Sequence, residues 1–246
     1  MAQKIRLDIL AFKRGFVPSL NKLAALIMEG KVTVDGKIIT KPGFAVSETS
    51  EIFIKESDEF VSRGGIKLKK ALEEFAICVK DKICLDVGAS TGGFTDCLLK
   101  NGVKKVYCVD VGYGILDSKL RNDPRVVVIE KTNIRYFDKK YLKDEIDLAV
   151  VDVSFISLEK VLPIVVKLVK NNGEIIALVK PQFEAPKGST QKGVVKDEKI
   201  YKQTIDKIKN FSETVGLVLL NEIPSPIKGP KGNLEHFLYL KKSNEI

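Results

Sequence analysis

The sequence contains few of the residues that build metal sites or disulfides. Its 246 residues include four cysteines and a single histidine, His236. No two cysteines have C-x-x-C spacing and no histidine is near them, so the pattern of a zinc site is absent. We expect four reduced, packed thiols, which favours a cytoplasmic protein.

Long apolar segments are also missing. The N-terminus lacks the apolar region of a signal peptide, and no stretch approaches the ~20 apolar residues that span a bilayer. A membrane-embedded protein is therefore not expected.

The composition is typical of a soluble, basic protein, and the chain is long enough for two domains. Hydrophobic residues make up 44% and charged residues 30% of the chain, which is typical of a globular protein. The formal net charge of +9 favours a polyanionic partner such as nucleic acid, although a lysine-rich proteome gives the same balance without any partner.

The first 58 residues predict a compact unit of two helices followed by short strands. Apolar spacing indicates helices over residues 6–15 and 19–30, with Ser19 as an N-cap and Gly15 as a left-handed stop. An Asp35-Gly36 pair suits a tight hairpin between strands at 32–34 and 38–39, and a third strand is expected at 52–54.

This first unit is strongly basic. Residues 1–41 contain three acids and eight basic residues, namely Lys4, Arg6, Lys13, Arg14, Lys22, Lys31, Lys37 and Lys41. Charge alone is equally compatible with a solvated surface. The order of residues 6–8, 19–27 and 30–36 resembles the αL RNA-binding domain first known from a ribosomal protein. Such domains read RNA shape and phosphates, which fits a basic surface with few exposed aromatic side chains.

The rest of the chain alternates apolar runs and helical patterns, as expected for an α/β doubly wound sheet. Seven strands are predicted, at residues 83–87, 106–110, 126–129, 148–153, 174–179, 217–222 and 237–240. The first five are expected to be parallel. The last is expected to join by a hairpin and run antiparallel. The domain boundaries that follow are 1–58 for the RNA-binding domain, 59–64 for a linker and 65–246 for the sheet domain.

A glycine-rich turn follows the first of these strands. Residues 88–93 have the spacing G-x-x-x-G-G, not the G-x-G-x-x-G of a NAD site, and Asp110 closes the next strand, where a carboxylate can accept both ribose hydroxyls of an adenosine. The pattern favours S-adenosylmethionine, and the alternative is an ordinary tight turn. The residues expected to bind the cofactor are Gly88, Ser90, Gly92, Phe94, Asp110, Asn133 and Asp152.

Several motifs along the whole chain resemble the TlyA family. They lie at residues 61–68, 86–94, 110–114, 121–126, 152–158, 178–184 and 229–235. The resemblance implies a Rossmann-like methyltransferase fold similar to the FtsJ group, which uses S-adenosylmethionine to methylate ribose 2′-hydroxyls. It also implies cytidines of ribosomal RNA, in one or both ribosomal subunits, as the target.

Methyl transfer to a 2′-hydroxyl requires a group that takes or shares its proton. Lys180 follows an apolar strand and Asp152 ends a neighbouring one, so both are expected at the carboxyl edge of the sheet, and an antiparallel last strand brings Glu235 there too. The resemblance to the FtsJ group implies that Lys67 completes a Lys-Asp-Lys-Glu tetrad. Its Arg-Gly-x-x-Lys-Leu context selects it over Lys69 and Lys70. Lys180 is the expected base, and no metal is required.

Two loops flank this predicted edge. Residues 184–199 and 224–232 are rich in glycine, proline and lysine, and are interpreted either as an RNA clamp or as ordinary surface loops. His236 is expected to be structural because a lone histidine in a strand is seldom catalytic.

Two other functions are weighed against the methyltransferase. Haemolytic activity has been attached to this family, but the sequence has no evident membrane-active segment. An RNA-binding protein with an inactive methyltransferase fold is disfavoured because all four tetrad positions are filled. The short N-terminus and the stop at Ile246 favour the large ribosomal subunit alone as substrate.

Overall fold

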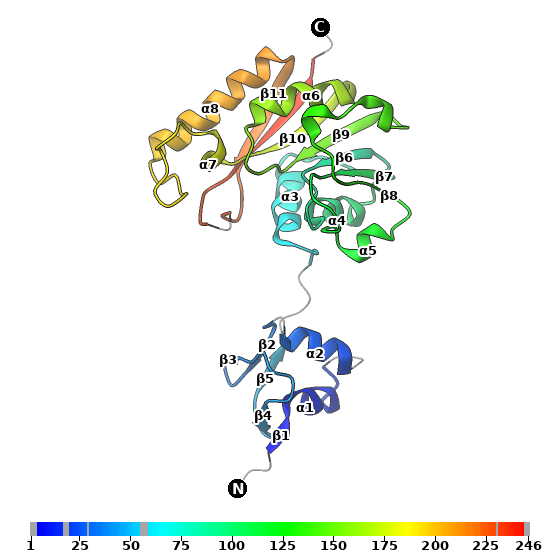
Figure 1. Cartoon of the computed structure of the whole chain (residues 1–246), viewed down its shortest axis with the longest axis vertical. Helices are drawn as coiled ribbons and strands as arrows, with labels where there is room; N and C mark the ends of the chain where they lie inside the picture. The colour runs from blue at the N-terminus through cyan, green and yellow to red at the C-terminus, as the bar shows by residue number, and fades with distance from the viewer. Residues whose placement is uncertain (1–3, 17–19, 29, 55–58, 230, 244–246) are drawn as a thin grey trace. The chain divides into compact units, whose positions relative to one another are not determined.

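The computed structural model describes residues 4–16, 20–28, 30–54, 59–229 and 231–243, without the side chains of residues 21, 22 and 25. The chain divides into two compact units, Met1–Asp58 and Glu59–Ile246. Each is described by itself below (Figure 1).

The first unit packs two helices against short antiparallel strands. The elements are β1 (Lys4–Arg6), α1 (Leu7–Lys13), α2 (Leu20–Met28), β2 (Val32–Val34), β3 (Lys37–Ile38), β4 (Ala45–Ser47) and β5 (Ile52–Ile54). Strands β3, β2 and β5 form one sheet, and β1 pairs with β4. The core comes from the apolar faces of both helices, including Leu7, Leu23 and Ile27, together with Val32 and Val34 of β2.

Local sequence explains the turns of this unit. Asp35 and Gly36 both have positive φ, at 49° and 77°, which is the hairpin geometry predicted for that pair. Gly15, with φ of 74°, follows the end of α1 as expected. The predicted N-cap Ser19 and the basic side chain of Lys22 lie outside the described residues.

Two expectations for this unit are wrong. Strands β1 and β4 were not predicted, because each is three residues long and pairs only with the other. The surface was expected to expose few aromatic side chains. All four phenylalanines of the unit are exposed, Phe53 at 63% and Phe12, Phe16 and Phe44 at 40–45%.

The second unit is built on the predicted seven-stranded sheet. Its strands are β6 (Ile83–Val87), β7 (Lys105–Val109), β8 (Val126–Ile129), β9 (Ile146–Val151), β10 (Val169–Val179), β11 (Leu217–Pro224) and β12 (His236–Lys242). The order across the sheet is β11-β12-β10-β9-β6-β7-β8. The five strands from β6 to β10 are parallel to one another, and β12 runs antiparallel between β10 and β11, as predicted.

Helices cover both faces of this sheet (Figure 1). They are α3 (Arg63–Glu74), α4 (Gly93–Lys100), α5 (Ser118–Arg121), α6 (Leu162–Leu168), α7 (Pro181–Glu184) and α8 (Glu198–Thr214), with 3-10 turns η1 (Ile134–Tyr136), η2 (Lys139–Tyr141) and η3 (Leu158–Lys160). Each face of the sheet has its own hydrophobic core, and alternate residues of β6 point into one or the other. Leu85 and Val87 pack with α6 and α8, whereas Cys84 packs with α3 and α4. The central strands, such as β6 and β9, are therefore buried on both faces, which explains their continuous apolar sequences.

Three details differ from the sequence-based expectations. Helix α3 begins at Arg63, inside the range assigned to a linker, and β10 begins at Val169, five residues earlier than predicted. Cys84, Cys97 and Cys108 are buried, and burial raises the pKa of each thiol, but Cys78 is exposed and not packed. Within the described ranges, no helix combines the length and the apolar character needed to cross a membrane.

Candidate active site

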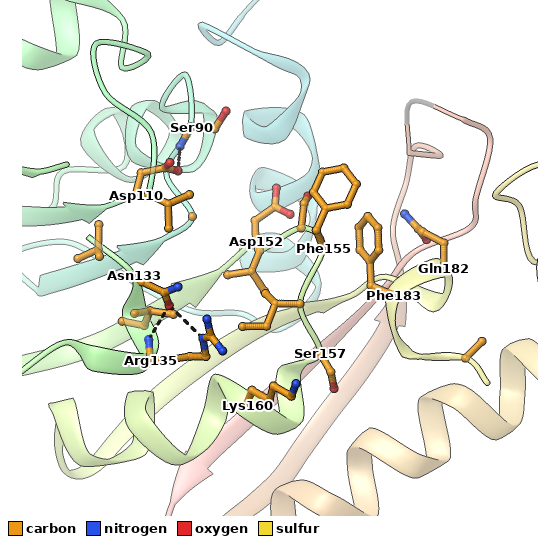
Figure 2. A pocket seen from close by; sticks show the side chains of 18 of the residues that line it. Ser90, Asp110, Asn133, Arg135, Asp152, Phe155, Ser157, Lys160, Gln182 and Phe183 are labelled. Atoms are coloured by element: carbon orange, nitrogen blue, oxygen red, sulfur yellow. Dashed lines mark hydrogen bonds between the residues drawn. The ribbon is translucent and has the colours of Figure 1, made fainter. Parts of the chain in front are cut away.

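The carboxyl ends of the parallel strands surround a cleft of about 920 Å³ (Figure 2). This is the edge at which ligands of doubly wound sheets bind. Five of the seven residues predicted to bind a cofactor line the cleft, namely Gly88, Ser90, Asp110, Asn133 and Asp152.

Asp110 is fixed at the end of β7 by two backbone donors. The N–H of Ser90 donates to Oδ2 at 2.8 Å (Figure 2), and the N–H of Gly112 donates to Oδ1 at 2.7 Å. Each oxygen retains a lone pair, because a carboxylate has about four acceptor positions. The carboxylate is therefore held in one orientation and can still accept hydrogen bonds from a ligand in the cleft.

Gly88 allows the turn after β6 to approach β9 closely. Its φ is +83°, and a Cβ at this position would lie 2.6 Å from the carbonyl oxygen of Asp152. Only glycine fits this combination of backbone conformation and contact. The turn thereby brings the backbone of residues 88–90 to the floor of the cleft.

The other two predicted cofactor residues do not line the cleft. Gly92 has φ of +95° and packs against Leu120, whose Cδ1 lies 2.2 Å from where a Cβ would be. Phe94 is 3% exposed and its ring lies 6.2 Å from that of Phe237 in the core. Both residues shape the start of α4, and their contact with a bound cofactor stays a prediction.

Two of the predicted tetrad residues form an ion pair beside the cleft. Lys180 Nζ lies 2.6 Å from Asp152 Oδ1 and donates to Ser154 Oγ at 2.9 Å. Their side chains are 11% and 21% exposed, and Asp152 and Ser154 line the cleft, whereas Lys180 lies behind them. The pair joins the ends of neighbouring strands β9 and β10.

The other two tetrad residues form a second, more deeply buried ion pair. Lys67 Nζ lies 2.5 Å from Glu235 Oε2, and the two side chains are 8% and 0% exposed. Val179 faces His236 in the β10–β12 register, which places Glu235 beside Lys180 at the next position. The four charged residues therefore lie on adjacent strand ends and on α3.

The surroundings of Lys67 differ from those of Lys69 and Lys70, the next two lysines in the sequence. Lys69 pairs with Glu59 and Lys70 with Glu74, in both cases with side chains more than 40% exposed. Only Lys67 points to the sheet edge, because it lies on the buried face of α3.

Comparison with known proteins supports this geometry. Residues 60–242 match the FtsJ-like methyltransferase family, and residues 5–52 match the S4 domain. The chain is 43% identical over its full length to the 16S/23S rRNA (cytidine-2′-O)-methyltransferase TlyA of Mycobacterium tuberculosis, 92% of which is covered. The chain belongs to the TlyA family.

Two further members show how the family has been named. Hemolysin A of Brachyspira hyodysenteriae is 45% identical over 96% of this chain and 99% of its own length. A solved structure from Streptococcus thermophilus, provisionally named a hemolysin, has a TM-score of 0.77 and 39% identity, covering 99% of this chain and 90% of that chain. Both relatives match nearly the whole length of this chain.

The cleft fits the S-adenosylmethionine of this methyltransferase family. The fixed carboxylate of Asp110 suits ribose hydroxyls, and the backbone of the Gly88 turn is open to a close ligand. Gln182, which also lines the cleft, has a buried side-chain oxygen with no hydrogen-bond partner among the described residues. An unsatisfied buried oxygen of this kind is accounted for by a polar ligand or water.

The sequence reasoning missed an aromatic pair in the TlyA cleft. Phe155 is 90% exposed, and its ring lies 4.9 Å from that of Phe183 (Figure 2). Phe155 also has φ of +63°, a strained conformation for a residue with a large side chain. The available signal was an aromatic residue three positions after the catalytic-edge Asp152, in a motif already singled out.

His236 has the structural role that was expected. Its Nδ1 lies 2.9 Å from Tyr201 Oη and its Nε2 lies 3.3 Å from Glu222 Oε2. Burial lowers the pKa of His236, so the ring is neutral near pH 7. These contacts tie the start of β12 to α8 and β11.

Proposed function

We propose that this TlyA protein is an S-adenosylmethionine-dependent methyltransferase that modifies the 2′-hydroxyl of cytidine in ribosomal RNA. The observation that carries the proposal is the pair of ion pairs, Lys180–Asp152 and Lys67–Glu235, at the edge of a cofactor-sized cleft. The name of the Mycobacterium tuberculosis relative supports both the RNA and the atom that is methylated.

Cofactor binding is assigned to one side of the cleft. Asp110 accepts hydrogen bonds from the ribose hydroxyls of the cofactor, and the backbone after Gly88 approaches it without a side chain in between. Bound S-adenosylmethionine supplies a methyl group on a sulfonium, which needs an in-line oxygen nucleophile and no metal.

Proton transfer is assigned to Lys180. Asp152 and Ser154 hold its side chain from 2.6 Å and 2.9 Å as an ammonium group, which has no free lone pair. Nζ therefore releases a proton to solvent first, and the neutral amine then takes the proton of the target 2′-hydroxyl. Asp152 and Ser154, which hold Lys180, line the cleft, and the target hydroxyl is proposed to reach Lys180 from that side.

The buried pair Lys67–Glu235 has a supporting role. Its low exposure, 8% and 0%, means that the two charges stabilise each other and hold α3 against the start of β12. We propose that they orient the target ribose and the Lys180–Asp152 pair, and that proton transfer proceeds at Lys180.

Phe155 and Phe183 provide an aromatic surface for the target base. Base–aromatic stacking contributes about 1–3 kcal/mol per base. A base taken out of its RNA stack could lie on the exposed ring of Phe155, which Phe183 supports from 4.9 Å. This contact would place the ribose of the same nucleotide near Lys180.

The S4 domain and the basic charge complete the proposal. We propose residues 1–58 as the RNA-binding domain and 59–246 as the catalytic domain, because residues 59–64, which were expected to form a linker, belong to the second unit. We further propose that the enzyme acts in the cytoplasm, where its ribosomal substrate is found. Exposed Lys13, Lys37 and Lys41 provide phosphate contacts on the first unit.

The test is transfer of radiolabelled methyl groups from S-adenosylmethionine to ribosomal subunits from a strain that lacks the gene. We expect labelled RNA, and separate 16S and 23S fractions identify the subunit. Leakage of dye from liposomes is measured in parallel, because two relatives are named as hemolysins. Absence of labelling together with cofactor-independent leakage would reject the methyltransferase proposal.

A further inference from the structure

Two loops at the active edge of the sheet are joined by one buried side chain. The first loop, residues 185–197, connects α7 to α8, and the second, residues 225–235, connects β11 to β12. Both lie at the same end of the second unit (Figure 1). Asn233 of the second loop is 1% exposed and contacts the first. We call these two segments, without residue 230, the loop pair.

Asn233 makes a two-point contact with the backbone of the first loop. Its Oδ1 accepts from the N–H of Val195, and its Nδ2 donates to the carbonyl oxygen of Gly193, each at 2.9 Å. An amide side chain carries a donor and an acceptor on one planar group, which this contact requires. Alanine would leave both backbone groups without the partner that they have here.

The contact stabilises a tight turn at the tip of the first loop. Gln191 and Val194 exchange two backbone hydrogen bonds, at 2.8 Å and 3.0 Å, around Lys192 and Gly193. Those two residues have φ of 51° and 82°, so the turn is of the left-handed hairpin type. Asn233 is thus bound to a defined turn and not to an irregular stretch of backbone.

The first loop also forms part of the wall of the cofactor cleft. Residues 185–188 and Thr190 line it. Lys187, Lys192 and Lys196 are exposed along the loop, and the side chain of exposed Lys231 from the second loop lies against Gly193. The loop pair therefore presents several cations next to the cleft, which suits the phosphates of an RNA strand.

The second loop leads directly to the buried ion pair. The Asn233 carbonyl oxygen accepts from the N–H of Gly229 at 2.9 Å, and a Cβ on Gly229 would lie 2.4 Å from Glu235 Oε1. The Glu235 carbonyl oxygen in turn accepts from the N–H of Ser225 at 2.8 Å. The second loop is thus folded over the carboxylate that pairs with Lys67.

From these contacts we infer that Asn233 is a positioning residue that couples RNA binding to the catalytic tetrad. By holding the turn at Gly193, it fixes the cationic first loop relative to Glu235 two residues further along the chain. RNA phosphates bound to the loop pair are then placed at a set distance from the Lys67–Glu235 pair. This inference rests on the proposed function for its substrate, but the loop contact itself does not.

The test uses the full-length protein with Asn233→Ala, and Asn210→Ala, on the exposed side of α8, as the matched control. Limited trypsin digestion reports how often the first loop opens, because cleavage follows Lys187, Lys192 and Lys196. We expect cleavage there to be about tenfold faster in Asn233→Ala, from the loss of two buried hydrogen bonds. The control should be cleaved at the rate of the wild type.

Kinetics distinguish positioning from simple destabilisation. We expect the KM for ribosomal RNA to rise and kcat to fall, with the stoichiometry of S-adenosylmethionine binding unchanged. A variant that was only less stable would have fewer cofactor sites and an unchanged KM. An unchanged KM together with unchanged trypsin cleavage would overturn the inference.

Hydrogen exchange of the wild-type protein keeps the inference testable if Asn233→Ala does not fold. The Val195 amide proton should exchange slowly, since it is donated to a buried side chain, whereas rapid exchange would contradict the coupling. These trypsin and exchange results do not depend on methyl transfer. A wild-type enzyme that failed to label RNA would therefore reject the proposed function separately.

Discussion

The buried ion pair between Lys67 and Glu235 makes a quantitative prediction about stability. The two side chains are 8% and 0% exposed and their charged atoms are 2.5 Å apart. Removing one partner of such a pair leaves an uncompensated buried charge and typically costs about 3–5 kcal/mol. We expect losses of this order for Lys67→Met and Glu235→Gln, each made alone.

The double variant has a different expected outcome. Lys67→Met combined with Glu235→Gln leaves no isolated charge, but the buried amide loses its partner, which costs about 1–3 kcal/mol. The double variant should therefore lose about 1–3 kcal/mol, clearly less than the sum of the two single variants. Methyl transfer should be impaired in all three proteins, because the pair is part of the proposed tetrad.

Thermal unfolding of the second unit, followed by circular dichroism or calorimetry, measures this pattern. A loss of 3 kcal/mol should lower its Tm by about 6–12 °C for a domain of this size. Lys69→Met is the matched control, because Lys69 and Glu59 form an ion pair with side chains 43% and 53% exposed, and such pairs contribute at most about 1 kcal/mol. Additive losses in the double variant, or single variants as stable as the control, would refute the reasoning.

Three further predictions concern the cleft and the core. Phe155→Ala should raise the KM for ribosomal RNA about tenfold, through lost stacking, while the Tm stays unchanged because the ring is 90% exposed; an unchanged KM would exclude Phe155 from RNA binding. Burial raises the pKa of Asp86 to about 7 from 3.8. Protonated Asp86 therefore contributes its full share to the free energy of unfolding below pH 4. This contribution is lost as the pH rises to 7, by at most about 1.4 kcal/mol per pH unit. Asp86→Asn should flatten the Tm profile over that range, and an unflattened profile would contradict the raised pKa. Gly88→Ala should lower both the Tm and the cofactor affinity, because its Cβ would lie 2.6 Å from a carbonyl oxygen. Gly114→Ala is the control: Gly114 also has a positive φ, +69°, but no atom lies within 4 Å of where its Cβ would be. This variant should lose only the free energy of placing a non-glycine residue in the left-handed conformation.

Much of the fold was predictable because its strands are buried on both faces. Continuous runs such as residues 83–87 and 148–151 have few alternatives to a parallel sheet, and the glycine-rich turn marks where the cofactor edge begins. The antiparallel direction of β12 followed from the missing helix before it. This direction is what brings Glu235 to Lys180.

The site was less predictable where the direction of a side chain decides whether a residue faces the cleft or the core. Gly92 and Phe94 lie in the same motif as Gly88, but the helix that starts there turns them into the core against Leu120 and Phe237. The exposure of Phe155 depends on a positive φ that sequence periodicity does not report. Asn233 lies in the motif at residues 229–235, but its contact could not be predicted, because Val195 lies 38 residues away along the chain.

The most direct test of the central claim is nucleoside mass spectrometry of ribosomal RNA treated with the purified enzyme and S-adenosylmethionine. The wild type should produce 2′-O-methylcytidine, and Lys180→Ala should bind the cofactor normally but produce none. Methylation by Lys180→Ala at the wild-type rate would remove Lys180 as the base. A methyl group found on a base nitrogen or carbon would contradict the assignment of the ribose hydroxyl as the target.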